Sequence, residues 1–131
     1  MSRVPSYCTL MPVLSLNKDG VSFAIPPVQQ GSRAYRVRLE YRGVSGRVPR
    51  VCLWQVGPDR CASLPVLRGR RAWQAIDETV ALDSEVQALR LFLYADGGGA
   101  RPTVAEYRNI HVGPVGSVAI THCMEGTTTL P

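Results

Sequence analysis

Aromatic and charged side chains alternate with apolar residues in several short segments of this chain, a pattern that suits sugar binding. Aromatic rings stack on the C–H faces of sugar rings, and Arg and Glu side chains hydrogen-bond the sugar hydroxyls. The outward positions of these segments hold both kinds of residue. They predict one sugar-binding face, with stacking by Trp54, Phe92 and Tyr94 and hydroxyl contacts from Arg38, Glu40 and Arg90.

Two other interpretations of these residues remain open. A basic stripe with interleaved aromatics is typical of single-stranded nucleic-acid binding. The arginines here are scattered, with Arg70-Arg71 as the longest basic run, so we expect no nucleic-acid partner. Alternatively, Trp54 and Tyr94 are packing residues beneath loops or a neighbouring domain. The domain would then be a structural or protein-interaction module without sugar binding.

Catalysis has little support in the sequence. The only histidines are His111 and His122, and the ten acidic residues are dispersed. A nucleophile with its base, or a carboxylate pair for glycoside hydrolysis, would depend on contacts that no motif indicates. Gly97-Gly98-Gly99 precedes a predicted strand rather than a helix, so it is no phosphate-binding loop. We expect a protein that is not an enzyme.

The four cysteines lack the CxxC spacing of zinc sites. Cys52 ends one predicted strand and Cys61 begins the next, so a disulfide between them closes an easy local loop. Cys8 and Cys123 lie near the two termini, which often approach each other in a compact domain. We expect the Cys52–Cys61 disulfide and leave the Cys8–Cys123 pair open. Disulfides indicate an oxidising compartment, whereas four reduced, buried cysteines are the alternative.

Alternation with period two predicts the strands that would position these residues. In residues 35–42, the apolar positions Tyr35, Val37, Leu39 and Tyr41 face one way and the charged positions face the other. Turn-forming residues separate such segments every 8–12 residues, roughly the spacing typical of a sandwich. The predicted strands are residues 13–16, 21–25, 35–42, 50–55, 62–67, 73–82, 89–94, 104–112 and 115–122.

These segments predict an all-β fold, a two-sheet antiparallel sandwich of the jelly-roll type with eight or nine strands. Asn17-Lys18-Asp19-Gly20 predicts a hairpin turn between residues 13–16 and 21–25. The length of 131 residues suits one domain over residues 1–131, which we expect to be excised from a larger protein.

The composition leaves the chemistry of the partner open. The net charge is +5, and Lys18 is the only lysine among 15 basic residues. A solvated surface explains this charge, but an anionic partner such as an acidic glycan remains an alternative. The chain has no run of 18 apolar residues and no signal-peptide pattern, so we expect no direct membrane insertion.

Residues 33–113 resemble the jelly rolls of carbohydrate-binding modules. The resemblance is carried by residues 35–42, by Trp73 at the start of a strand, by residues 89–97 and by residues 103–112. Residues 50–55 and 57–61 are similar to a more specific family of domains. They look like the extracytoplasmic β-sandwich modules of actinobacterial cell-wall glycosyltransferases, in particular the membrane arabinofuranosyltransferases.

The resemblance implies a noncatalytic module that binds or positions a cell-wall polysaccharide, such as arabinan, for a linked catalytic domain. It implies an extracytoplasmic place, on the cell-envelope or periplasmic side, within a larger membrane or exported protein. Sugar-binding jelly rolls often hold a structural calcium ion. Where many relatives carry an Asp pair, this chain has Arg108-Asn109, so Glu106 and Asn109 are the nearby candidate ligands.

Overall fold

A computed structural model describes most of the chain. The described residues are 6–10, 13–25, 34–45, 48–64, 71–96, 103–115, 119–122 and 124–126. These residues form strands joined by turns and loops, and no helix among them is long and apolar enough to cross a membrane.

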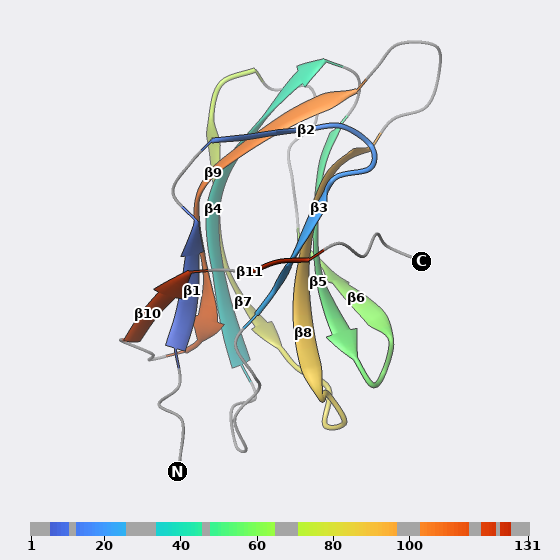
Figure 1. Cartoon of the computed structure of the whole chain (residues 1–131), viewed down its shortest axis with the longest axis vertical. Helices are drawn as coiled ribbons and strands as arrows, with labels where there is room; N and C mark the ends of the chain where they lie inside the picture. Colours follow the sequence, from blue (N-terminus) through green and yellow to red (C-terminus); the bar gives the residue numbers. More distant parts are fainter. Residues whose placement is uncertain are drawn as a thin grey trace.

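The described residues form eleven strands in two sheets, which face each other as two layers (Figure 1). The first, here the β9–β4 sheet, has the order β10-β1-β9-β4-β7, and β2 also pairs with β9. Its strands are β1 (Ser6–Leu10), β2 (Leu14–Leu16), β4 (Ala34–Ser45), β7 (Gln74–Ala81), β9 (Val104–Pro114) and β10 (Ala119–His122).

The second sheet, here the β8–β5 sheet, has the order β11-β3-β8-β5-β6. Its strands are β3 (Val21–Ala24), β5 (Val48–Val56), β6 (Arg60–Ser63), β8 (Ala88–Asp96) and β11 (Met124–Gly126).

The pairing confirms the sandwich. β1 and β2 pair with β9, β3 with β8, β4 with β7, and β5 with β6, all antiparallel. These nested pairs are those of a long hairpin rolled into two sheets, which is the jelly-roll arrangement. Each of the nine predicted strands overlaps an observed one, with shifted ends, although residues 65–67 and 116–118 of two predicted strands lie outside the described residues. β1 and β11 are additional, and β1 and β10 form a parallel pair at the sheet edge.

Alternation along the central strands separates the core from the outer faces. On β4, Tyr35, Val37, Leu39 and Tyr41 are at most 2% exposed, whereas the intervening charged residues face outward. Leu89, Leu91 and Leu93 on β8 face them from the other sheet. Burial of these apolar side chains is the main stabilising contribution to such a sandwich.

The predicted hairpin at residues 17–20 is wrong in its pairing. The turn itself is present, since Asn17 accepts from the backbone N–H of Gly20 and Gly20 has a φ of 64°. However, β2 pairs with β9 and β3 pairs with β8, so the two strands belong to different sheets. β2 extends the β9–β4 sheet and β3 extends the β8–β5 sheet. This arrangement buries more apolar surface than an isolated two-stranded ribbon would.

Candidate functional site

The outward residues of β5 and β8 form the surface that we call the aromatic face. It comprises Arg50, Cys52 and Trp54 on β5 and Arg90, Phe92 and Tyr94 on β8. In the register, Tyr94 lies opposite Arg50 and Trp54 lies opposite Arg90. The two rows are therefore four positions apart along β5, or about 13 Å along the strand.

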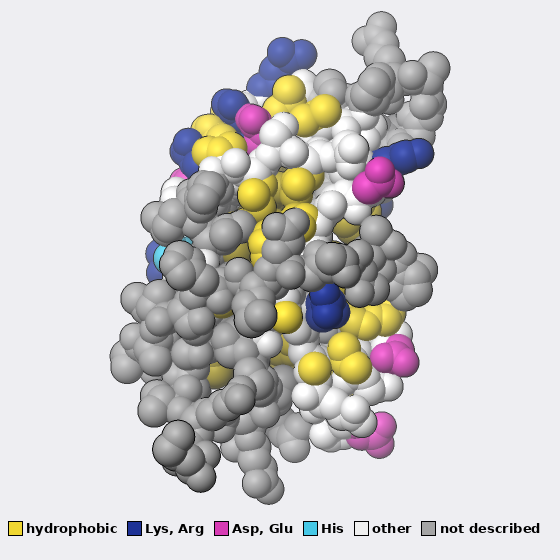
Figure 2. Space-filling model, viewed as in Figure 1, with side chains coloured by type: hydrophobic (Ala, Val, Ile, Leu, Met, Phe, Trp, Pro, Cys, Tyr) yellow, Lys and Arg dark blue, Asp and Glu magenta, His cyan; other side chains and the backbone are white. Residues whose placement is uncertain are grey.

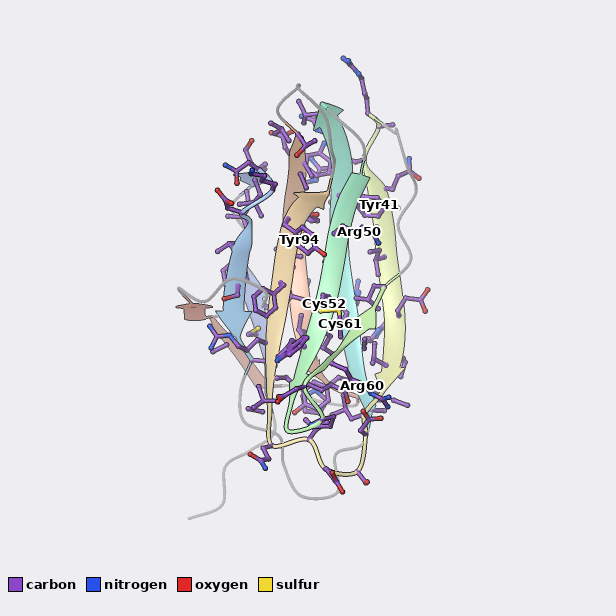
Figure 3. The ribbon with its side chains drawn as sticks, turned by 90° about the vertical axis from the view of Figure 1, so that its right-hand side faces the viewer. Tyr41, Arg50, Cys52, Arg60, Cys61 and Tyr94 are labelled. Carbon is purple, nitrogen blue, oxygen red and sulfur yellow. A yellow bond between two sulfur atoms is a disulfide. The ribbon has the colours of Figure 1, made fainter. Side chains whose placement is uncertain are left out.

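The backbone beneath Tyr94 is fixed from the core side. The hydroxyl of Tyr107, a fully buried residue of β9, donates a 2.6 Å hydrogen bond to the carbonyl of Tyr94. It also accepts a 2.9 Å hydrogen bond from the backbone N–H of Arg50. Burial raises the pKa of Tyr107, so the hydroxyl stays protonated and remains a donor. Figure 3 shows Tyr94 and Arg50 on neighbouring strands, above the disulfide.

The turn before β3 supports Tyr94 from another direction. A Cβ added at Gly20 would lie 2.5 Å from the Cβ of Tyr94 and would also meet the backbone oxygen of Leu93. The turn is tied to β8 as well, because the backbone N–H of Ala95 donates to the carbonyl of Asn17. The position of Tyr94 is therefore held by its own strand, by Tyr107 and by this turn.

Trp54 lies in the second row of the aromatic face. Its register neighbours are Arg90 on β8 and Cys61 on β6. Cys61 is joined to Cys52 by a disulfide with a Cα–Cα separation of 5.5 Å, which confirms the predicted bridge. Arg90 donates to the hydroxyl of Ser22 over 3.1 Å, and its Nε makes no hydrogen bond within the described part of the chain.

Exposure divides the three predicted stacking residues. Trp54 and Tyr94 are half-buried, so part of each ring remains accessible. Phe92 is only 4% exposed and lies between Ser22 and Cys52 in the register. The expectation that Phe92 offers a ring for stacking is therefore wrong, since its side chain forms the floor between the two accessible rings.

The expectation of a single face for all six residues is also wrong. Arg38 and Glu40 lie on β4, whose outward residues cover the outside of the other sheet. Alternation assigned each residue correctly to an outward side. A sandwich has two outward sides, however, and the assignment of a strand to a sheet depends on distant pairing. The structure places Trp54, Tyr94 and Arg90 on one face, with Phe92 between the two rows.

The outside of the β9–β4 sheet, here called the charged face, carries a different arrangement. The Arg42 guanidinium lies 2.6 Å from Glu106, and Arg108 lies 2.8 Å from Glu40. Both guanidiniums also contact the ring of Trp73, at 4.6 Å for Arg42 and 3.9 Å for Arg108. Acids and arginines thus alternate between the two strands beside an aromatic ring, a favourable arrangement of cation–π and ion-pair contacts.

Sequence reasoning did not find this Trp73 cluster. The signal was present in the alternating charges of residues 36–42 and 106–108, but the register that brings them together is nonlocal. Figure 2 shows dark-blue, magenta and cyan side chains adjoining one another along the left margin, on the side of β9 and β4. The half-buried His111 belongs to this face, and burial and Arg38 lower its pKa.

The two predicted calcium ligands also lie on the charged face. Asn109 has a φ of 54° at a bulge where β9 shifts register against β4, a conformation that Asn tolerates well. Its amide donates over 2.6 Å to Glu40, which also accepts from Arg108. Glu106 instead binds Arg42 over 2.7 Å. The two candidates therefore have separate partners, and the described residues contain no metal-ligating group of three His, Cys, Asp or Glu.

The acids with a resolved pKa shift are suited to ion pairing. Hydrogen bonds from Arg108 and Asn109 lower the pKa of Glu40, and the hydrogen bond from Arg36 lowers that of Asp77. Asp83 has a lowered pKa because it accepts from Arg60, beside a polar pocket of about 300 Å³. A general acid needs a raised pKa, so these three carboxyl groups are poorly placed for that role.

Cys8 is disulfide-bonded, and Cys123, the partner considered from the sequence, lies outside the described residues. The disulfides indicate an oxidising environment.

No protein-family model matches the chain, and no curated protein matches its sequence. The resemblance to carbohydrate-binding modules and arabinofuranosyltransferase domains therefore stays a prediction.

Proposed function

We propose that this domain is a noncatalytic carbohydrate-binding module and that the aromatic face holds the glycan. One observation carries the proposal: Trp54 and Tyr94 are both half-buried and lie on the same outward face of two paired strands. Such rings stack on the C–H faces of sugars with little loss of side-chain freedom, because their neighbours already restrict them.

Polar groups beside the rings support the same function. Arg90 lies in the row of Trp54 and is half-buried, so part of this side chain reaches the surface. A guanidinium carries five N–H donors, and sugar hydroxyls accept hydrogen bonds from such groups. Arg38 and Glu40 leave the proposed sugar contacts, because they lie on the opposite sheet.

The separation of the rings favours an extended glycan over a single sugar. With the rows about 13 Å apart along the strand, one monosaccharide would contact one ring at a time. We therefore propose a linear polysaccharide as the ligand. The resemblance of the sequence supports a cell-wall glycan such as arabinan, held beside a linked glycosyltransferase on the extracytoplasmic side.

Calorimetric titration with arabinan and mannan fragments tests this function. We expect weak, saturable binding that is lost in both Trp54→Ala and Tyr94→Ala, because an open platform buries little surface and needs both rings. Trp73→Ala is the matched control, since Trp73 lies on the charged face. Absence of heat with every polysaccharide would reject sugar binding and favour the structural or protein-interaction module.

A further inference from the structure

Arg38 occupies an unusual position on the charged face. In the register it lies between His111 on β9 and Asp77 on β7, so Asp77 is its nearest cross-strand acid. Asp77 nevertheless gives both oxygens to Arg36, with two hydrogen bonds of 2.7 Å. The Nε of Arg38 is left 3.9 Å from Asp77, and its side chain is 55% exposed.

The contrast with the rest of the face is clear. Arg42 and Arg108 each have a carboxylate of their own, in Glu106 and Glu40. At the other end of the face, by contrast, Arg36 and Arg38 share Asp77. Within the described residues, Arg38 is thus an exposed guanidinium that makes an ion contact of 3.9 Å and no hydrogen bond. The positive charge of the face is concentrated there.

We propose that the charged face binds an oxyanion group, a phosphate or a carboxylate, on the guanidinium of Arg38 beside Arg36. A guanidinium presents its N–H donors as a planar fork that matches two oxygens of such a group. Arg36 adds a second positive charge two residues away on the same strand face, and Asp77 holds Arg36 in place. The anion therefore supplies the hydrogen-bond acceptor that Arg38 lacks among the described residues.

The other groups around this site are compatible with an anion. His111 lies opposite Arg38 on β9, and Thr9 lies beyond it on β1, so neither adds negative charge. The acid on the other side, Asp77, has both oxygens in hydrogen bonds to Arg36, which offsets its charge. His122 occupies the next register position on β10. The site lies on the sheet opposite the proposed glycan platform and stands independently of it.

The Nε–H resonances of the arginines in the intact 131-residue chain test the site. The sample is titrated with inorganic phosphate and, separately, with glucuronate, at constant ionic strength adjusted with chloride. We expect a saturating shift of the Arg38 signal, identified by its loss in Arg38→Gln. The signals of Arg42 and Arg60 are internal controls and should stay in place, since their Nε groups already bind Glu106 and Asp83.

The two arms separate the possible sources of the anion. A shift with phosphate alone identifies a phosphate group, a shift with glucuronate alone identifies a carboxylated glycan, and shifts with both identify a general oxyanion site. Arg38→Lys retains the charge without the fork, so anion-induced shifts of the neighbouring backbone amides should weaken strongly. An unmoved Arg38 signal in both titrations, or equal movement of Arg38, Arg42 and Arg60, would overturn the proposal.

Discussion

The Tyr107 hydroxyl donates a 2.6 Å hydrogen bond to the backbone carbonyl of Tyr94, and this bond links the two sheets. Tyr107 belongs to β9, and Tyr94 belongs to β8. The same hydroxyl accepts a hydrogen bond from the backbone N–H of Arg50. One buried group therefore fixes both strands beneath the row of Tyr94 and Arg50. The core and the proposed binding surface are therefore mechanically connected at this point.

Replacing Tyr107 by Phe should lower the free energy of unfolding by about 1–3 kcal/mol, because part-buried backbone groups of Arg50 and Tyr94 lose a partner. Tyr35→Phe is the matched control. The Tyr35 hydroxyl is buried and makes no hydrogen bond to any described residue, so its removal should be neutral or stabilising. Urea unfolding measures both, and equal effects of the two substitutions would contradict this account of Tyr107.

Gly20→Ala should destabilise the domain and disturb Tyr94. The backbone at Gly20 has a φ of 64°, and an added Cβ would lie 2.5 Å from the Cβ of Tyr94. The strain and the clash together predict a loss of about 1–3 kcal/mol in the free energy of unfolding. Urea unfolding and the amide chemical shifts of β8 report the two effects. An unchanged urea midpoint would show that this turn does not pack closely against Tyr94.

Removal of the Cys52–Cys61 disulfide should reduce stability. The bridge spans a sequence separation of 9 residues. Loop-closure entropy for a loop of this size predicts a loss of about 2–3 kcal/mol. The double variant Cys52→Ala with Cys61→Ala, compared with the parent chain in urea unfolding, measures it. A loss well below 1 kcal/mol would mean that the β5–β6 pairing needs no covalent support.

The exposed ion pairs predict how stability depends on pH. Asp77 and Asp83 have lowered pKa values in the folded state because Arg36 and Arg60 donate to them. Their contribution is fully present above the ordinary carboxyl value of 3.8 and is lost as the pH falls through the lower, folded-state pKa. In Asp77→Asn with Asp83→Asn, urea midpoints should therefore fall less between pH 5 and pH 2, a range set by those values. An unchanged acid dependence would contradict this.

The sequence was sufficient for the fold because alternation is a local signal. The residues around Leu39 on β4 and Leu91 on β8 repeat with period two, and both prove to be buried. The sequence was insufficient for the strand pairing around Asn17–Gly20. A tight turn has the same residue pattern whether the strands on either side pair with each other or join different sheets.

The candidate site was predicted only in part for the same reason. Trp54, Tyr94 and Arg90 were correctly assigned to outward positions, and they do share a face. Alternation also assigned Arg38 to an outward position, but Arg38 lies on the other sheet. The contact of Trp73 with Arg108 joins residues 35 positions apart across β4, and no local pattern encodes it.

The two tryptophans provide the most direct test of glycan binding on the aromatic face. The chain has two tryptophans, with Trp54 on one sheet and Trp73 beside the other, so single-tryptophan variants report on one face at a time. Trp73→Phe leaves Trp54 as the only emitter, and Trp54→Phe leaves Trp73. With arabinan fragments, we predict a saturable change in emission from the Trp73→Phe variant and none from the Trp54→Phe variant. Unchanged emission from Trp54 on titration, or a change in emission from Trp73 alone, would contradict the proposed glycan platform.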